Sequence, residues 1–335
     1  MIRVGLIGCG GMGSTHANCY MALSETVKLV ALADLDEKKA KALSGSAEIY
    51  STGMELIERA DVDVIDICLP TYLHTEHAVK AMEKGRNVFL EKPLCLNMGE
   101  AKLLLETAEK TGVKIQIGQV IRFWDEYVWL KNAYDENKYG KIISGVFTRL
   151  SPNPKWSWNN WYNKVELSGS MATDLHIHDV DFVRWLMGSE PEEVYSKATR
   201  SSDGVIQQLF TTYKFGETVI SSEGCWDYPD NFPFSMTFRV KFEKATVEYA
   251  KEVLTVYPAE GEPFTPELEK AFAVKKDVGI NLSNMGAYYS ELKYFTDKLI
   301  AGETPDRATL PEAAKSLELA LKEMEIAGGV VKGGK

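Results

Sequence analysis

The chain has 335 residues, of which 45% are hydrophobic and 26% are charged, the composition of an ordinary globular protein. Its formal net charge of −10 at pH 7 argues against non-specific binding to nucleic acid or to an anionic membrane, because both need basic faces. No apolar run has membrane-spanning length, and Met1–Gly13 does not have the pattern of a secretory signal. A chain of this length favours two domains.

The cysteines point to a reducing compartment. There are five of them, an odd number without a CxxC pair, at Cys9, Cys19, Cys68, Cys95 and Cys225. This usage is typical of reduced thiols and not of a disulfide framework or a zinc site. We therefore predict a cytoplasmic protein.

The N-terminal stretch has the pattern of a dinucleotide-binding turn. The apolar run Val4–Ile7 predicts a buried parallel strand, glycines follow it, and Ser14–Ala17 can open a helix. At this spacing the first glycine permits a tight turn, the second lets the backbone approach phosphate, and the third lets the helix pack closely on the strand. The predicted pyrophosphate contacts are Gly8, Gly10, Gly11, Met12 and Gly13.

An acidic residue follows the second strand. Val27–Ala33 is apolar and ends at Asp34, about 20 residues after the last glycine, where a carboxylate can bind the adenosine ribose hydroxyls. Such a carboxylate repels a 2′-phosphate, so NAD is favoured over NADP. A turn or capping role is the alternative for Asp34. Lys38 and Lys39 lie near enough to accommodate a phosphate.

Strands and helices then alternate up to about residue 120. Helices are predicted at 37–43, from 54, at 74–84 and at 103–110, and strands at 62–69, 87–90 and 113–118. This alternation predicts right-handed βαβ units and a doubly wound parallel sheet of the Rossmann type. We assign residues 1–120 to an NAD(P)-binding domain.

The second half has a different texture, with strands predicted at 146–150, 207–215, 217–223, 235–242 and 245–256. A helix at 177–186 precedes most of them, and amphipathic helices are predicted at 285–301 and 311–328. We predict an α+β domain over residues 121–335, with a large, mainly antiparallel, open-faced sheet. The C-terminal helix is a candidate for packing back on the first domain. The aromatic stretch 156–162 is too irregular for a regular element and is either a loop over the site or local packing.

Two polar clusters follow predicted parallel strands, where doubly wound sheets bind ligands. The first contains Pro70, Thr71 and His74, and the second is Glu91-Lys92-Pro93. Partial burial lowers the pKa of a lysine and suits it to proton transfer. The alternative is a surface lysine paired with Glu91.

A third cluster lies within Gly169–Asp179. If this segment is helical, Asp174 and His178 stand at i and i+4 and share a face, so the carboxylate can orient the imidazole. His176 then points elsewhere. An Asp/His cluster also suggests a metal, but no third ligand has suitable spacing, so we predict none. The remaining alternative is that these side chains are structural and make their hydrogen bonds within the fold.

Taken in order, these motifs resemble the Gfo/Idh/MocA oxidoreductases. The resemblance covers nearly the whole chain and adds Arg122-Phe123 and the run Tyr289–Phe295 to the clusters above. It implies a Rossmann domain followed by an α/β domain whose open sheet commonly forms a subunit interface. The implied chemistry is hydride transfer between NAD(P) and a carbinol of a sugar, cyclitol or related polyol.

The resemblance also implies roles for individual residues. Lys92 matches the family's active-site lysine, Asp174 and His178 match its Asp-x-x-x-His pair, and His178 is the expected proton acceptor. Two positions depart from the family: Ser170 stands where many members have glycine, and His176 where a small residue is common. Further cofactor contacts are expected at Pro70, Thr71, His74, Glu91, Lys92, Gln119 and Arg122, and substrate contacts at Lys92, Trp161, His176, His178 and Tyr288.

The sequence thus predicts an NAD-dependent dehydrogenase or reductase that acts on a polyol, an inositol-like cyclitol or a sugar. Its expected partners are this small molecule and further copies of the chain, as a homodimer or homotetramer formed through the second domain's sheet. Two other functions stay open. One is glycoside hydrolysis with NAD as a transient oxidant, and the other is a non-catalytic NAD-binding sensor.

Overall fold

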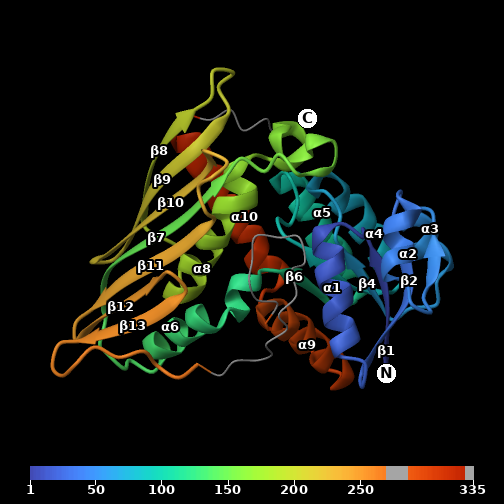
Figure 1. Ribbon diagram of the computed structural model, residues 1–335, viewed down its shortest axis with the longest axis horizontal. Coiled ribbons are helices and arrows are strands. Elements are labelled where there is room, and N and C mark those ends of the chain that lie inside the picture. The colour runs from blue at the N-terminus through green and yellow to red at the C-terminus, as the bar shows by residue number, and fades with distance from the viewer. Residues whose placement is uncertain (269–285, 329–335) are drawn as a thin grey trace. The chain divides into compact units, whose positions relative to one another are not determined.

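A computed structural model describes residues 1–268 and 286–328 (Figure 1). The described chain forms two compact units. The first contains residues 1–123 and 286–314, and the second contains residues 124–268 and 315–328. The division falls within helix α10 (Leu310–Ile326). Met285, the expected first residue of the penultimate helix, lies outside the described residues.

The first unit is built on a six-stranded parallel sheet in the order β3-β2-β1-β4-β5-β6. All neighbouring strands are parallel, which confirms the predicted doubly wound sheet. The order reverses between β1 and β4, and ligands of such sheets bind where the order reverses, at the carboxyl ends of the strands. The strands are β1 Ile2–Ile7, β2 Val27–Ala33, β3 Glu48–Tyr50, β4 Val64–Ile67, β5 Asn87–Glu91 and β6 Ile115–Gly118.

Helices connect these strands, and their ends follow capping residues. Helix α5 begins at Met98 and not near Leu103 as predicted, because the Asn97 side chain accepts a hydrogen bond from the Glu100 N–H. It ends at Gly112, whose φ of 68° is left-handed. Helices α1 and α9 lie side by side (Figure 1). The helices of this unit are α1 Gly11–Ala22, α2 Glu37–Leu43, α3 Gly53–Arg59, α4 His74–Glu83, α5 Met98–Thr111 and α9 Gly286–Ile300, with short 3₁₀ turns η1 Thr71–Leu73 and η2 Val120–Phe123.

The second unit contains a seven-stranded sheet in the order β13-β12-β11-β7-β10-β9-β8. Only β7 and β10 pair in parallel among these strands. The strand predicted over 245–256 is wrong, because Lys251 and Glu252 have φ of 51° and 62° and turn the chain into a hairpin. The strands are β7 Ile142–Pro152, β8 Glu193–Arg200, β9 Ile206–Phe215, β10 Thr218–Tyr228, β11 Ser235–Phe242, β12 Ala245–Ala250 and β13 Val253–Pro258.

Helices α6 (Asp125–Asp135), α8 (Ile177–Met187) and α10 lie on one face of this sheet (Figure 1). An aromatic cluster joins α6 and α8 to the sheet: Tyr127 of α6 packs edge-on against Phe182 of α8 at 4.7 Å and against Phe238 of β11 at 4.9 Å. The sequence did not predict α6, although its buried residues recur at helical spacing. Strand residues that point away from the helices stay exposed, among them Val146, Tyr195, Phe210 and Val219.

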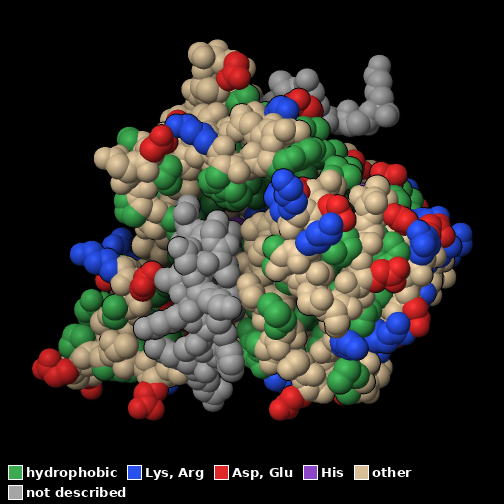
Figure 2. All heavy atoms as spheres, turned by 45° about the vertical axis from the view of Figure 1, so that its right-hand side comes forward, with side chains coloured by type: hydrophobic (Ala, Val, Ile, Leu, Met, Phe, Trp, Pro, Cys, Tyr) green, Lys and Arg blue, Asp and Glu red, His purple; other side chains and the backbone are tan. Residues whose placement is uncertain are grey.

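Acidic and basic side chains are interspersed on the face that Figure 2 shows. Elsewhere among the described residues, charged side chains of opposite sign form ion pairs, for example Lys80 with Glu58. Among the described helices, none has the length and apolar character needed to cross a membrane.

Candidate functional site

The glycine turn after β1 has the geometry expected of a phosphate-binding loop. Gly8 has a φ of +91°, and a Cβ there would lie 2.4 Å from the Cys68 carbonyl oxygen. A Cβ on Gly13 would lie 1.8 Å from the Gly8 carbonyl oxygen, whereas one on Gly10 would meet nothing within 4 Å. The first and third glycines therefore allow close packing, and the second leaves open space where a phosphate can approach.

Helix α1 begins at Gly11, earlier than the predicted opening at Ser14, so Gly11, Met12 and Gly13 form its first turn. No side chain caps this N-terminus. Uncapped N–H groups and the helix dipole favour an anion at this position.

Asp34 follows β2 and holds the neighbouring turns. Its Oδ2 accepts the Cys9 N–H at 2.7 Å, and its Oδ1 accepts the Asp36 N–H at 2.7 Å. The half-buried carboxylate is thereby fixed next to the glycine turn. Because each oxygen has a second lone pair, ribose hydroxyls can still donate to it. The turn-forming and ribose-binding roles are compatible.

Two further predicted cofactor residues carry polar atoms without a partner among the described residues. They are Thr71 Oγ1 and Gln119 Oε1, on residues that are 1% and 2% exposed. Buried polar groups are rarely left without a hydrogen bond, and such exceptions often mark a ligand site. Together with the open space at Gly10, they fit a bound dinucleotide. Pro70 precedes η1 directly, and Arg122 lies in η2, 2% exposed.

Both ring nitrogens of His74 face backbone carbonyl oxygens. Its Nδ1 lies 2.8 Å from the Pro93 carbonyl oxygen and its Nε2 lies 2.8 Å from the Leu69 carbonyl oxygen, and the side chain is buried. The ring thus links the end of β4 to the turn after β5. Burial lowers the pKa of His74. This position favours a structural role for His74 over direct cofactor contact.

The Glu91-Lys92-Pro93 turn ends β5, with a cis peptide before Pro93. Lys92 is half-buried and Glu91 is buried. Glu91 bonds to the backbone of the turn, since its Oε2 accepts the Lys92 N–H at 3.1 Å.

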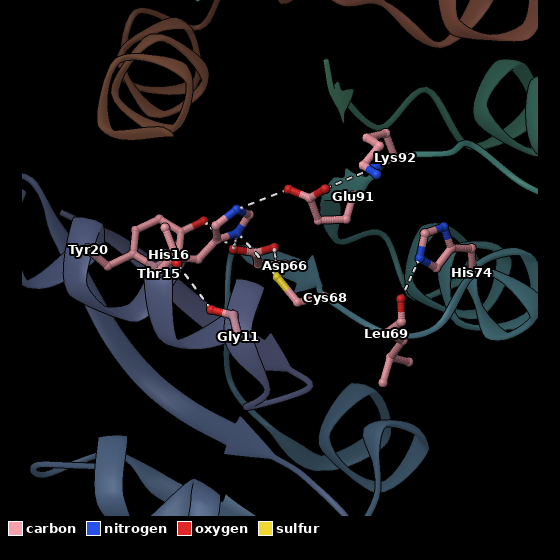
Figure 3. Close-up of polar contacts among 10 residues, drawn as sticks. All are labelled: Gly11, Thr15, His16, Tyr20, Asp66, Cys68, Leu69, His74, Glu91 and Lys92. Atoms are coloured by element: carbon pink, nitrogen blue, oxygen red, sulfur yellow. Dashed lines mark hydrogen bonds and ion pairs between the residues drawn. The ribbon is translucent and has the colours of Figure 1, made fainter. Parts of the chain in front are cut away.

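A buried polar cluster lies between α1, β4 and β5 (Figure 3). His16 Nδ1 lies 2.9 Å from Asp66 Oδ2, and the Tyr20 hydroxyl donates to the same oxygen at 2.8 Å. His16 Nε2 lies 3.2 Å from Glu91 Oε1. The Cys68 thiol lies 3.3 Å from His16 Nδ1 and donates to Asp66 Oδ1 at 3.5 Å.

Within the described residues, His16, Asp66 and Cys68 are also the one group with the spacing of metal ligands, their candidate atoms lying within 4.8 Å of one another. A metal would need the thiolate of Cys68. Burial and the neighbouring Asp66 carboxylate raise the pKa of Cys68 well above its usual range. In this metal-free cluster Cys68 is therefore a hydrogen-bonded thiol.

The predicted Asp/His pair belongs to the second unit. Residues Ala172–His176 form a π-helical turn, and α8 begins at Ile177. Asp174 and His178 thus lie on either side of a change of helix type within one helical segment, and their sharing of a face stays a prediction. Asp174 is buried and His178 is half-buried. Single π-helical turns often occur at functional sites.

Two anchors hold this segment against the sheet. Asp179, directly after His178, accepts two hydrogen bonds from Arg149 of β7, at 2.9 and 3.0 Å. His176 Nε2 lies 2.8 Å from Glu323 Oε2 of α10. Both contacts are buried, so both orient the helix start that carries Asp174 and His178.

Glu323 is the centre of the second anchor. It is fully buried and also accepts hydrogen bonds from Tyr213 at 2.7 Å and from Thr211 at 3.1 Å. His176 itself is fully enclosed and packs against Gly224, where a Cβ would come within 2.8 Å of its ring. Its Nε2 thus has a structural partner, whereas its buried Nδ1 has none among the described residues, and the substrate contact stays a prediction.

The remaining predicted substrate residues lie in separate units. Trp161 stacks on Tyr162 at 4.1 Å within the 3₁₀ segment Trp158–Asn163 of the second unit. Tyr162 in turn packs against the core cluster that contains Trp226. Tyr288 of α9 lies in the first unit, with its ring 6.4 Å from that of His16.

Sequence reasoning missed His16, Asp66, Glu323 and the Arg149–Asp179 pair. Polar residues inside apolar strands and helix faces were a usable signal. Asp66 interrupts the run Val62–Leu69, and Glu323 lies between Leu321 and Met324. A charged side chain at a core-facing position needs a partner, although sequence does not identify which one.

Comparisons with known proteins agree with this architecture. Residues 2–119 match the model of an oxidoreductase family with an NAD-binding Rossmann fold, and residues 127–248 match the GFO/IDH/MocA C-terminal domain. The chain belongs to the Gfo/Idh/MocA family, as its motifs indicated.

Curated relatives include myo-inositol 2-dehydrogenase of Thermotoga maritima, 30% identical over 58% of both chains. Another is scyllo-inositol 2-dehydrogenase (NAD(+)) of Bacillus subtilis, 31% identical over 56% of this chain and 55% of that protein. The alignments span less than two thirds of these relatives. Among solved structures, levoglucosan dehydrogenase in complex with NADH and levoglucosan has a TM-score of 0.85 at 20% identity, covering 98% of this chain and 97% of that one. This last likeness concerns the fold alone.

The Glu323 network predicts a large stability loss on truncation. Glu323→Ala leaves His176, Tyr213 and Thr211 without their buried acceptor, and we expect unfolding to become easier by about 3–5 kcal/mol. Urea unfolding measures this change. Glu325→Ala, on an exposed position of the same helix, is the control and stays within about 0.5 kcal/mol of the parent chain. Equal losses in both variants would contradict the network's role.

Substitution of Ser170 by glycine is expected to increase stability. Its φ is +83°, a region that favours glycine, and its buried hydroxyl has no partner among the described residues. Ser170→Gly removes both the backbone strain and the unpaired hydroxyl. Together these cost more than the extra entropy of glycine in the unfolded chain, so we expect the free energy of unfolding to rise by about 1 kcal/mol. Thermal unfolding checks it, with Ser201→Gly at a turn as control. A lower Tm for Ser170→Gly would contradict this account.

Proposed function

We propose that this protein is an NAD-dependent oxidoreductase that transfers hydride between the nicotinamide and a secondary alcohol or carbonyl of a polyol, cyclitol or sugar. One observation carries the proposal most directly. A glycine cradle with an uncapped helix N-terminus and the Lys92 turn stand at the carboxyl ends of β1 and β5 in one parallel sheet, with β4 between them. The names of the relatives, which are inositol dehydrogenases, support the substrate class.

The cofactor would be held by residues of the first domain. The N–H groups of the first turn of α1 bind the pyrophosphate, and Asp34 binds the adenosine ribose. Thr71 and Gln119 offer buried polar atoms for further contacts. When bound, NAD supplies the hydride acceptor at its nicotinamide ring. Residues 1–120 are thus the proposed cofactor domain and residues 121–335 the proposed substrate domain.

Side chains of the protein would accept the proton of the substrate hydroxyl and stabilise the charge on the reacting oxygen. As an alcohol is oxidised, its hydroxyl proton must leave, and a histidine titrates near neutral pH, so His178 accepts that proton. Asp174 orients the imidazole. Lys92 donates a hydrogen bond to the reacting oxygen and stabilises negative charge that develops there.

Preference for NAD over NADP follows from Asp34. A carboxylate at the ribose repels a 2′-phosphate, and the carboxylate is held in place by two backbone N–H groups. Lys38 and Lys39 are exposed at the start of α2 and provide the competing positive charge.

Association of copies through the open sheet of the second domain is also proposed. Exposed Val146, Phe210 and Val219 supply apolar area on the face opposite the helices. Light scattering distinguishes a dimer from a tetramer. Cell fractionation tests the proposed cytoplasmic location.

The direct test is Lys92→Ala and His178→Ala enzyme, with NADH absorbance followed against a panel of polyols, inositols and sugars. Loss of charge stabilisation or of the base should lower kcat by about 100-fold or more. Lys102→Ala, on the exposed face of α5, is the control with unchanged turnover. Near-parental kcat in both active-site variants would refute the mechanism. Glycoside cleavage without net NADH would favour the hydrolase alternative, and NAD binding without any turnover would favour the sensor.

Cofactor selection is tested with Asp34→Asn. Asparagine keeps an acceptor for the turn but removes the charge, so kcat/KM should fall with NAD and rise with NADP, shifting the ratio by about 10-fold or more. Asp36→Asn is the matched control, because Asp36 caps α2 and asparagine caps equally well. An unchanged ratio in Asp34→Asn would contradict the ribose assignment.

A further inference from the structure

His16 lies between two carboxylates that come from different strands. It belongs to the second turn of α1, the helix that starts at the glycine cradle, and it is fully buried. Asp66 of β4 faces its Nδ1 at 2.9 Å, and Glu91 of β5 faces its Nε2 at 3.2 Å (Figure 3). The ring thus connects one helix to two adjacent strands of the sheet.

This environment favours the protonated ring. Burial alone lowers the pKa of His16, but the neighbouring Asp66 carboxylate raises it, and the pKa lies well above the ordinary value of 6.5. The Nδ1 of this ring hydrogen-bonds with Asp66, whereas Nε2 lies at ion-pair distance from Glu91 Oε1 without the geometry of a hydrogen bond. Other described residues near the ring include Tyr20 of α1, which donates to Asp66, Phe89 of β5, whose ring lies 5.5 Å away, and Tyr288 of α9, whose ring lies 6.4 Å away.

Glu91 connects the His16 ring to the backbone of Lys92. One carboxylate oxygen faces His16, and the other accepts the Lys92 N–H at 3.1 Å. The side chain is only 5% exposed and packs against Gly118, where a Cβ would lie 2.9 Å from Glu91 Oε1. Glu91 thus lies between the His16 ring, at ion-pair distance, and the Lys92 N–H, which its other oxygen accepts.

The choice of residue argues against simple core filling. Burying a cation and two carboxylates is costly, and apolar side chains of similar volume would fill the same space without that desolvation. The cluster's geometry is directed instead: it begins on the cofactor helix and ends at the backbone of Lys92.

We propose that His16 is a positioning residue for Lys92, holding the Lys92 backbone through Glu91 and tying its placement to the helix that receives the cofactor phosphates. The inference rests on the proposed function for the meaning of Lys92. The effect of His16 on the environment of Lys92 can be measured by chemical labelling, without any substrate.

The test compares His16→Gln with Tyr20→Phe in the full-length chain. Tyr20 lies one helical turn further along α1 and donates to the same Asp66 oxygen, but it has no link to Glu91. Tyr20→Phe therefore disturbs the cluster without touching the connection to Lys92. Acetic anhydride labels the lysines at a series of pH values, and peptide mass spectrometry reports the rate at Lys92 relative to exposed Lys102.

In His16→Gln we expect the pH profile of Lys92 labelling to shift and kcat to fall by about 10- to 100-fold, with KM for NAD changed by less than about 3-fold. Tyr20→Phe should match the parent chain in both readouts. If folded His16→Gln labels and turns over as Tyr20→Phe does, the proposal is wrong. If His16→Gln does not fold, His16→Asn takes its place, since it also removes the ring that faces Glu91, and the same criteria apply.

The pH dependence of stability provides a second measurement. Because the folded pKa of His16 is raised, its stabilising contribution is complete below about pH 6.5 and is lost as pH rises through the folded pKa. Urea midpoints should therefore fall more steeply with rising alkaline pH in Tyr20→Phe than in His16→Gln, and equal slopes would overturn the protonated state. A chain that oxidises no polyol or sugar refutes the proposed function alone, and the labelling then decides the role of His16.

Discussion

Close approach of helix α1 to the ends of β1 and β4 is the constraint on which the first unit depends. Gly8 and Gly13 meet at a distance that no side chain could occupy, and Gly8 also lies against the Cys68 carbonyl. This contact directs the helix N-terminus toward the edge of the sheet where the strand order reverses. It also brings His16, one turn further along, over Asp66 and Glu91. The cofactor cradle and the polar cluster therefore share one cause.

Each unit holds a predicted catalytic segment with a buried ionisable network. In the first unit the network runs from His16 to the Lys92 turn. In the second, Glu323 holds His176, and Arg149 holds Asp179, on either side of His178. Buried charges contribute less to stability than apolar packing of equal volume, but their hydrogen bonds are directional. Directional contacts suit the support of side chains whose chemistry requires a defined orientation.

Much of the fold was predictable from sequence. Buried parallel strands are continuous apolar runs, so β1, β2, β4 and β5 stood out against the helices between them. Boundaries were less certain, because caps and left-handed residues set them. Asn97 started α5 early, and Lys251 with Glu252 folded an apparent single strand into a hairpin. The π-helical turn before α8 was also hidden, since its sequence is compatible with an ordinary α-helix.

The sequence by itself determined the glycine spacing, Asp34 after the second strand and the family motifs around Lys92 and His178, because these signals depend on local order along the chain. Only the tertiary structure decided which buried polar residues meet. Asp66 and Glu91 lie far from His16 in sequence, and Glu323 lies farther still from His176, yet sheet and helix packing bring them within hydrogen-bonding or ion-pair distance. Such pairings depend on strand order and helix placement, which periodicity and motif spacing do not encode residue by residue.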